Sequence, residues 1–274
     1  MDKLQVLVAT MNMKNVHLMI ERMNIKTDCL IINQCNDTKY ENYKIEKSNI
    51  EVFSFNERGL SKSRNNALMR CTGDIICIAD DDIVYSDTYS SDILNEFYHH
   101  PEAEAIVFNL TSNLNERTGK LIKSFSRVHL MESKEYGSVH IAFRRESVIS
   151  RNVYFNILFG SGAKYNCGED TIFLKDLIMK GLKLYKSPVV IGAIDMTSST
   201  WFKGYNEKYF FTKGALISCM YKNFRYVIII IQSLRNSKRY LGSYKNFFDL
   251  YKWYSNGAND YVNFMKLNKE KRLY

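Results

Sequence analysis

Three adjacent aspartates, Asp80, Asp81 and Asp82, follow an apolar run at residues 75–79. Three neighbouring carboxylates repel one another, and a divalent cation removes that repulsion. Mg²⁺ and Mn²⁺ take oxygen ligands and typically bind one or two protein carboxylates together with substrate phosphates. Because open α/β folds bind ligands at the carboxyl ends of strands, the triplet predicts a metal-assisted site for a phosphorylated donor. The alternative is an acidic turn or helix N-cap, since Asp favours both.

A basic segment precedes the triplet. Residues 50–54 predict a short strand, Gly59 permits a tight turn, and Ser61 is expected to cap a helix over residues 62–70. A helix N-terminus with added Arg and Lys suits an anionic phosphate, although basic side chains on a helix usually face solvent. The basic side chains near this helix start are Arg58, Lys62 and Arg64.

The order of these motifs resembles the family-2 inverting glycosyltransferases, which have the GT-A fold and include bacterial enzymes that build capsule and other surface polysaccharides. In that family a Gly-Leu-Ser-x-x-Arg-Asn helix precedes a strand that ends in an Asp-x-Asp metal motif. This chain has Gly-Leu-Ser-Lys-Ser-Arg-Asn at residues 59–65, Asp-Asp-Asp at 80–82 and Gly-Glu-Asp at 168–170. The resemblance spans roughly residues 4–200. It implies a nucleotide-sugar donor, a Mn²⁺ or Mg²⁺ ion, and Asp170 as the catalytic base.

The resemblance also suggests which residues meet the nucleotide. The second strand departs from the family pattern, because many members have an Asp-Asp-Gly-Ser-like run where this chain has Asn-Gln-Cys-Asn at residues 33–36. Amides can hydrogen-bond a uracil edge, so a UDP-sugar stays the favoured donor, while the alternative makes Asn33 and Asn36 turn residues. The end of the first strand falls where the family contacts the base and ribose, at Ala9, Thr10 and Met11.

Carboxylates from two parts of the chain are candidates for the metal. The resemblance implies that Asp82, with help from Asp80, holds a cation that acts as a Lewis acid on the departing diphosphate. Asp80 also suits a ribose contact, and Asp81 suits either role. Asp195 lies roughly where some family members place a metal-binding His. The alternative for Asp195 is a cap on a turn.

Inversion needs a base on the acceptor side. A carboxylate can deprotonate the attacking hydroxyl, and Asp170 is the candidate, at a helix start beyond a flexible loop at residues 160–162. The alternative is that Glu169 and Asp170 only complement a helix dipole. Further acceptor candidates are Glu169, His140 and Trp201. The alternative to acceptor binding is a structural role for His140 and packing at a domain junction for Trp201.

The elements that would position these residues alternate between strand and helix. This pattern predicts an α/β fold of the Rossmann-like GT-A type, with a mixed, mostly parallel sheet flanked by helices. Pro188 predicts that the last strand is an edge strand or is divided into two pieces. Strands are expected at residues 4–10, 29–33, 50–54, 75–79, 104–110, 137–143 and 184–193, and helices at 15–23, 62–70, 87–98 and 170–180.

Positive charge is concentrated at the C-terminal end. Residues 203–274 contain 14 Lys and Arg against 4 Asp and Glu, whereas the rest of the chain is nearly neutral. We therefore expect a catalytic domain at residues 1–204 and a basic, aromatic-rich helical appendage at 205–274, with helices at 205–220 and 221–234. Basic groups beside the apolar run 227–231 suit peripheral contact with an anionic membrane that presents a lipid-linked acceptor. The alternative is that this run packs on the catalytic core or on a partner chain.

Composition argues against a membrane-spanning, a secreted or a disulfide-bonded protein. The longest apolar run, residues 226–231, is far shorter than a membrane span, and no signal-peptide core is evident. The six cysteines form no Cys-x-x-Cys pair, as expected for reduced thiols. We expect a cytoplasmic enzyme, peripheral on the inner face of the cell membrane, that transfers sugar to a glycan or lipid-linked acceptor. A metal-dependent nucleotidyltransferase is the alternative, and a nucleic-acid binder, for which no motif is present, is a weaker one.

Overall fold

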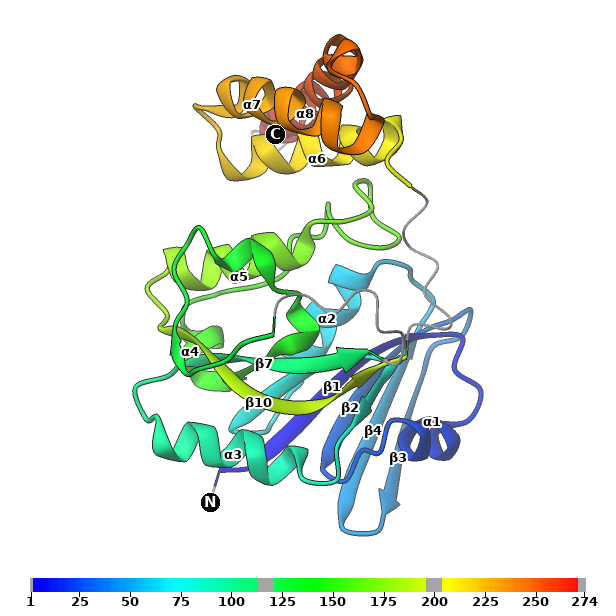
Figure 1. The fold of residues 1–274 in the computed structure, drawn as a ribbon. Coiled ribbons are helices and arrows are strands. Elements are labelled where there is room, and N and C mark those ends of the chain that lie inside the picture. Colours follow the sequence, from blue (N-terminus) through cyan, green and yellow to red (C-terminus); the bar gives the residue numbers. More distant parts are fainter. Residues whose placement is uncertain (1, 113–120, 196–203, 271–274) are drawn as a thin grey trace. The chain divides into compact units, whose positions relative to one another are not determined.

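The computed structural model describes residues 2–112, 121–195 and 204–270. The chain divides into two compact units. The first comprises Met1–Lys164 and Glu169–Ser199, and the second comprises Tyr165–Gly168 and Thr200–Tyr274. The first unit contains the sheet, and the second is built from helices (Figure 1).

A mixed sheet forms the centre of the first unit. In the described residues its order is β3-β4-β2-β1-β5-β9-β7-β10-β6, with β8 also paired to β10. Strands β4, β2, β1 and β5 are parallel, as are β7 and β10, whereas β3, β6, β8 and β9 pair antiparallel. The strands are β1 (Leu4–Met11), β2 (Asp28–Gln34), β3 (Lys39–Ile45), β4 (Ser48–Phe55), β5 (Ile75–Asp80), β6 (Ile83–Tyr85), β7 (Ala105–Ser112), β8 (Ser126–Arg127), β9 (Ile141–Arg144) and β10 (Leu184–Ile194).

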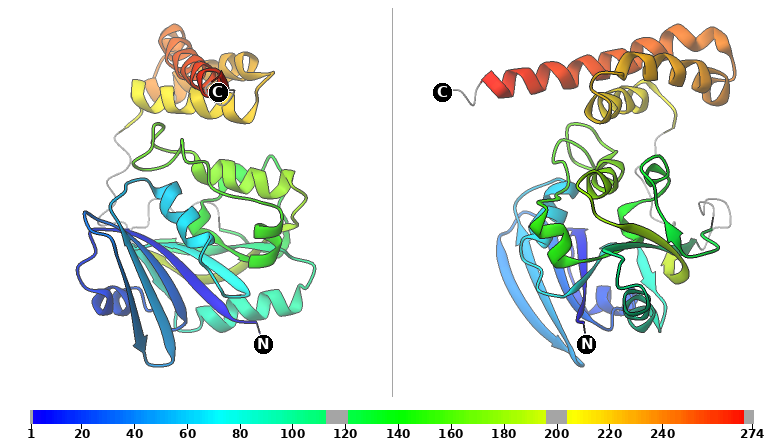
Figure 2. Two further views of the ribbon diagram at one scale, coloured as in Figure 1. Left: turned by 180° about the vertical axis from the view of Figure 1, so that it is seen from behind. Right: turned by 90° about the vertical axis from the view of Figure 1, so that its left-hand side faces the viewer.

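Helices cover both faces of this sheet (Figures 1 and 2). Successive side chains of a strand point to opposite faces, so Val6 and Val8 of β1 join one core cluster and Leu7 joins the other. Helices α1 (Val16–Arg22) and α3 (Tyr89–His99) pack on the first face. Helices α2 (Leu60–Leu68), α4 (Arg145–Ser150) and α5 (Glu169–Met179) pack on the second. This arrangement confirms the predicted fold class.

Several local expectations differ from the structure. The strand expected at residues 137–143 begins as a 3₁₀ turn, η2 (Ser138–His140), and only then becomes β9. Strand β3 was not expected, because its polar sequence lies at the exposed edge of the sheet. Strand β10 has a register shift around Pro188, and its two parts pair with β8 and β6 respectively, as expected for a strand in two pieces. A further 3₁₀ turn is η1 (Ser133–Glu135).

The second unit is a small helical assembly of α6 (Glu207–Met220), α7 (Arg225–Leu241), η4 (Tyr244–Asn246) and α8 (Phe247–Glu270). Helices α6 and α8 cross in backbone contact, since a Cβ on Gly214 would lie 1.9 Å from the Tyr254 carbonyl oxygen, and one on Gly257 would lie 1.8 Å from that of Phe211. Helix α7 begins later than expected, and α8 lies in the segment expected to be helical but had no predicted bounds. None of the helices in the described residues is long and apolar enough to cross a membrane.

A short segment that precedes α5 belongs to this helical unit. The hydroxyl of the fully buried Tyr165 donates to Asp260 Oδ2 at 2.7 Å, and Thr212 Oγ1 donates to Asn166 Oδ1 at 2.9 Å. The chain therefore passes between the two units three times, after Lys164, after Gly168 and after Ser199.

Candidate active site

The carboxyl ends of the parallel strands bring the predicted nucleotide and metal residues to one edge. Ala9 is in register with both Ile32 and Asp80, and Thr10 is in register with Asn33. Thr10 Oγ1 donates to Asp81 Oδ2 at 2.5 Å, which links the end of β1 directly to the triplet. Sequence positions that are 71 residues apart thus become neighbours because β1 and β5 pair in parallel.

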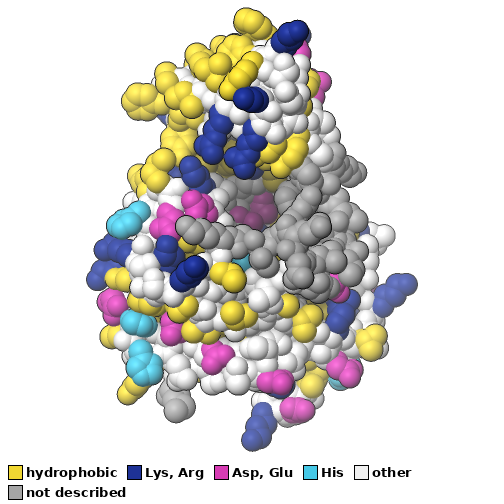
Figure 3. All heavy atoms as spheres, viewed as in Figure 1, with side chains coloured by type: hydrophobic (Ala, Val, Ile, Leu, Met, Phe, Trp, Pro, Cys, Tyr) yellow, Lys and Arg dark blue, Asp and Glu magenta, His cyan; other side chains and the backbone are white. Residues whose placement is uncertain are grey.

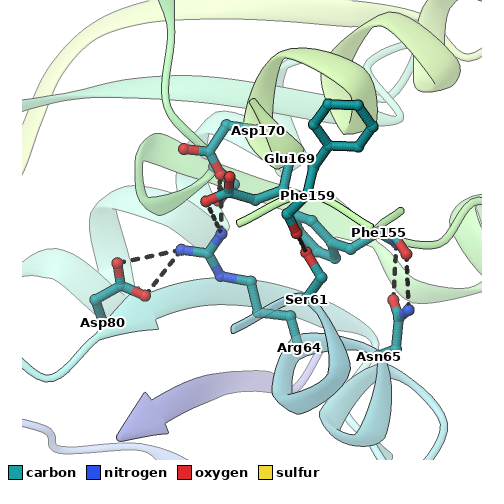
Figure 4. A network of polar contacts seen from close by, with 9 residues as sticks. Ser61, Arg64, Asn65, Asp80, Phe155, Phe159, Glu169 and Asp170 are labelled. Atoms are coloured by element: carbon teal, nitrogen blue, oxygen red, sulfur yellow. Dashed lines mark hydrogen bonds and ion pairs between the residues drawn. The ribbon is translucent and has the colours of Figure 1, made fainter. Parts of the chain in front are cut away.

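Arg64 of α2 connects three carboxylates (Figure 4). Its Nη2 donates to both oxygens of Asp80, at 2.8 and 3.1 Å, and its Nη1 donates to Asp170 Oδ1 at 2.9 Å and lies 3.6 Å from Glu169 Oε1. The guanidinium also lies over the Phe155 ring. Its side chain is 3% exposed, so these contacts are largely shielded from solvent. We expected Arg64 to contact phosphate, but the structure shows it between the triplet and the Glu-Asp pair.

Burial and charge act against each other in this network. Burial alone would lower the pKa of Arg64, and the charges of Asp80, Asp170 and Glu169 outweigh it, so the pKa is raised. Burial raises the pKa of Asp80, and Arg64 opposes that change. Burial, with the charge of Asp170, raises the pKa of Glu169 to about 7. Glu169 is therefore a buried partner of Arg64, and its contact with the acceptor stays a prediction.

Asp170 keeps one carboxylate oxygen open. Ser138 Oγ donates to Asp170 Oδ1 at 2.5 Å, and Arg64 binds the same oxygen. No hydrogen bond joins Oδ2 to any residue within the described ranges, and a Cβ on Gly137 would lie 3.7 Å from it. His140 is close to the same glycine, and its ring Nδ1 lies 3.1 Å from the Phe108 carbonyl oxygen. Burial lowers the pKa of His140, so its imidazole is neutral near neutral pH.

A small pocket of about 150 Å³ adjoins the triplet. Asp195 reaches it because β10 pairs with β6, and its backbone N–H donates to the Asp82 carbonyl at 2.8 Å. Burial, with the charges of Asp80 and Asp81, raises the pKa of Asp82 to about 6. The pocket is lined by Arg22, Asp81, Asp82, Val84 and Asp195.

The chemistry of this pocket suits a hard cation. Its carboxylates supply oxygen ligands, and the pKa of Asp82 is raised first by burial and then by the charges of Asp80 and Asp81, a repulsion that a cation would relieve. No preassembled group of three or more His, Cys, Asp or Glu ligands exists in the part of the chain that the structure describes. A cation with fewer than three protein ligands would have to complete its shell with water or with substrate phosphate.

The start of α2 is held by protein groups. Gly59, not Ser61, is the N-cap, so that expectation was wrong; the Ser61 hydroxyl instead donates to the Phe159 carbonyl at 2.6 Å. The Gly59 N–H donates to Gln34 Oε1 at 2.7 Å, and the Leu60 N–H donates to the Ser161 carbonyl at 2.9 Å. These two amides fix the helix start and are not available to phosphate.

The glycine loop before α5 is closely packed, in contrast to the flexible loop that we expected. Gly162 has φ +77, and a Cβ there would lie 3.2 Å from the Gly59 nitrogen. Gly160 has φ +108, and a Cβ there would lie 3.1 Å from Ser61 Oγ and 3.2 Å from Glu169 Cδ. Both glycines let this loop approach α2 and α5 closely.

The remaining predicted residues have varied surroundings. Asn33 lies within β2, so its turn alternative was wrong; its side chain is buried, accepts from the Met13 N–H and donates to Ser54 Oγ. Asn36 is exposed and accepts from the Arg58 guanidinium at 2.8 Å. Ala9 is buried, Met11 and Lys62 are exposed, and Trp201 lies outside the described residues.

The family model for glycosyl transferase family 2 matches residues 26–163, half of the chain. The chain belongs to glycosyl transferase family 2. The matched region includes α2 and the aspartate triplet and ends before Asp170. No curated protein matches the chain in sequence.

Solved structures support the fold of this family-2 chain. The S. aureus TarS fragment 1–349 in complex with UDP-GlcNAc aligns with a TM-score of 0.59 at 15% identity, over 78% of this chain and 65% of that one. The mannosyltransferase PcManGT from Pyrobaculum calidifontis, in complex with GDP-Man and Mn²⁺, aligns with a TM-score of 0.51 at 13% identity, over 100% and 81%. The chain spans less than two thirds of the TarS fragment's length. At these identities the likeness shows the GT-A fold.

Three site residues of this family-2 chain were missed by the sequence reasoning. Ser138 contacts the proposed base, and Gln34 accepts from the Gly59 N–H at the start of α2. Arg22 Nη2 donates to the Asp81 carbonyl at 2.8 Å and lines the pocket. Gln34 stood within a segment already considered for the nucleotide. No motif marked Ser138 or Arg22, since each reaches its partner only through the fold.

Proposed function

We propose that this chain transfers a sugar from a nucleotide-diphosphate donor, with a UDP-sugar favoured, to a glycan or lipid-linked acceptor with inversion. The observation that supports it most is the bridge through Arg64, which ties Asp80 of the triplet to Asp170 at the start of α5. The Arg64 guanidinium thereby fixes Asp80, on the donor side, relative to Asp170, which has an open carboxylate oxygen. Family membership and neighbours crystallised with UDP-GlcNAc and with GDP-Man and Mn²⁺ add support.

The metal part of the proposal assigns Mn²⁺ or Mg²⁺ to Asp82 and Asp195, with Asp80 as a further ligand. When bound, the ion would act as a Lewis acid toward the diphosphate leaving group. Asp80 already accepts two hydrogen bonds from Arg64, but a carboxylate has about four lone-pair sites and can still bind a cation or a ribose hydroxyl.

Asp170 is proposed to act as the general base. Its Oδ2 accepts the proton of the acceptor hydroxyl. At the same time the hydroxyl oxygen bonds to the anomeric carbon of the donor sugar, and the bond between that carbon and the diphosphate oxygen breaks. The nucleoside diphosphate leaves from the opposite face, which inverts the configuration. Arg64 and Ser138 hold Oδ1, so the carboxylate keeps the orientation in which Oδ2 is open.

The test is a panel of nucleotide sugars with purified protein, with and without chelator. Metal-dependent release of nucleoside diphosphate, lost in Asp82→Asn, is the expected result. With an acceptor, NMR of the product should show the opposite anomeric configuration to the donor. Release of sugar 1-phosphate, with turnover that does not depend on Asp170, would instead indicate nucleotidyl transfer, and retention of configuration would refute inversion.

A further inference from the structure

The outward face of α7 is apolar. Val227, Ile230, Ile231 and Leu234 follow the i, i+3, i+4, i+7 spacing of one helical stripe, and they are 57%, 42%, 55% and 49% exposed. Phe224, 68% exposed, precedes the stripe by one turn. In a helix packed on a water-soluble unit, this face should be polar.

The opposite face of α7 already serves the core of the helical unit. Ile229 is fully buried in the cluster with Phe210 and Leu250, and Ser233 and Ser237 are also fully buried. Of the run at residues 227–231, only Ile229 is buried, and Ile228 packs partly against the cluster. Packing within this unit therefore explains one face of α7 and leaves the apolar stripe without a role.

The charges around the stripe have one sign. Helix α7 contains no Asp or Glu, and the whole segment 208–248 contains eight Lys and Arg and no acidic residue. Lys238 continues the stripe one turn beyond Leu234, and the exposed Arg235 and Arg239 lie beside it. No carboxylate pairs with these three cations in the described part of the chain. Figure 3 shows hydrophobic side chains gathered over the helical unit with Lys and Arg side chains among them.

We propose that α7 binds the surface of an anionic membrane. The stripe enters the boundary between headgroups and acyl chains, and Arg235, Lys238 and Arg239 meet the anionic headgroups. An apolar stripe alone would suit a protein partner equally well, but a cationic border with no acidic residue complements a surface of uniform negative charge. The proposal stands on the helical unit alone and does not depend on sugar transfer by the first unit.

The experiment is co-sedimentation of the full-length protein with phosphatidylcholine vesicles, with and without phosphatidylglycerol. Binding should require phosphatidylglycerol and weaken as salt rises from 0.1 to 1 M, where the screening length falls from about 10 to about 3 Å. Replacing Arg235, Lys238 and Arg239 with Gln should lower the partition coefficient by roughly 100-fold, at about fivefold for each charge.

A matched control has the same loss of charge elsewhere. Replacing the exposed Lys44, Lys47 and Lys134 of the first unit with Gln should leave vesicle binding within about threefold of wild type, since the proposal assigns headgroup binding to the cations of α7. All six positions are exposed, so both triple variants should fold, which circular dichroism and thermal melting check.

A second variant tests the apolar stripe. Replacing Val227, Ile231 and Leu234 with Ser should lower binding to anionic vesicles at least about tenfold. Replacing the exposed Leu18 and Met69 of the first unit with Ser is its control. Wild-type protein that stays in the supernatant with anionic vesicles at low salt would overturn the proposal. So would equal losses in target and control variants. A dimer, seen by light scattering, that dissociates in the stripe variant without any vesicle binding would assign the face to a second copy of the chain.

Discussion

Replacing Arg64 with Met should destabilise the first unit by about 3–5 kcal/mol, the usual cost of removing one partner from a buried ion pair. The side chain of Arg64 is 3% exposed, and those of Asp80, Glu169 and Asp170 are 33%, 9% and 32% exposed. Without the guanidinium, these carboxylates remain partly desolvated with no cation between them. A protein of ordinary stability, about 5–15 kcal/mol, would survive this loss but with a clearly lower melting temperature.

The destabilisation should depend on pH. Without Arg64, the repulsion and burial that already raise the pKa of Asp80 and Glu169 act unopposed, so both pKa values rise further in the folded state. A carboxyl group with a raised pKa stabilises the fold at low pH and loses that contribution as pH rises through the folded pKa. The difference between wild type and Arg64→Met should therefore be larger at pH 8 than at pH 5.

Calorimetric unfolding at both pH values measures this difference, because it separates the transitions of the two units if they unfold independently. Arg64→Lys is the matched variant, since it keeps the charge but loses the planar fork that binds two carboxylates. It should be less destabilised than Arg64→Met. Adding Glu169→Gln to Arg64→Met should recover part of the stability, because it removes the most buried of the three charges.

Kinetics then distinguish a positioning role from a phosphate contact. If Arg64 positions Asp170, Arg64→Lys should lower kcat more than it weakens binding of the nucleoside diphosphate alone. A phosphate-binding Arg64 would show the reverse, with weaker nucleotide binding and similar kcat. The reasoning is refuted if Arg64→Met melts within experimental error of wild type at pH 8, or if Glu169→Gln brings no recovery.

Three further changes test other parts of the structure. Asp170→Asn should lower turnover by about 10²–10⁴, the usual contribution of general base catalysis, with donor binding by calorimetry nearly unchanged; near-normal turnover would remove Asp170 from the mechanism. In wild type, the stability that neutral Glu169 contributes is present below its unfolded pKa of 4.5 and is lost as pH rises through about 7. Between pH 4.5 and pH 7, the free energy of unfolding of Glu169→Gln should therefore rise relative to that of wild type by up to about 3 kcal/mol. Urea unfolding that shows a difference independent of pH would contradict this. Gly257→Ala should destabilise the helical unit by about 1–3 kcal/mol through overpacking against Phe211, whereas its exposed neighbour variant Asn256→Ala should melt like wild type.

The central strands could be predicted because they are buried on both faces. Such strands appear as continuous apolar runs, as at residues 75–79, where every side chain is buried. Strand β3, Lys39–Ile45, lacks that signal, since it lies at the sheet edge with exposed and half-buried side chains. The strand prediction was wrong at residues 138–140 for another reason. Ser138 is buried in a 3₁₀ turn, and burial alone does not distinguish a turn from a strand.

The sheet edge that carries the candidate site could be predicted, but the contacts within the site could not. The βαβ pattern predicts parallel strands, but only the sheet order shows that β1 pairs with β5 and so brings Thr10 to the triplet. The environment of Arg64 could not be predicted, because a basic residue near a helix start is equally compatible with phosphate, solvent or carboxylates. Its partners lie 16 and 106 residues away, and only the packed tertiary structure decides among these environments.

The two glycines at residues 160–162 show why that decision depends on backbone geometry. Arg64 can reach Asp80 and Asp170 together only if α2 lies close to the start of α5. That closeness requires Gly160, whose missing side chain leaves room for Ser61 and Glu169, and Gly162, which lies against Gly59. The hydrogen bond from the Leu60 N–H to the Ser161 carbonyl then fixes α2 to the loop. A Gly-Ser-Gly sequence suggests flexibility when considered alone. Here it allows the close packing that lets the Arg64 guanidinium contact both the proposed base, Asp170, and Asp80 of the aspartate triplet.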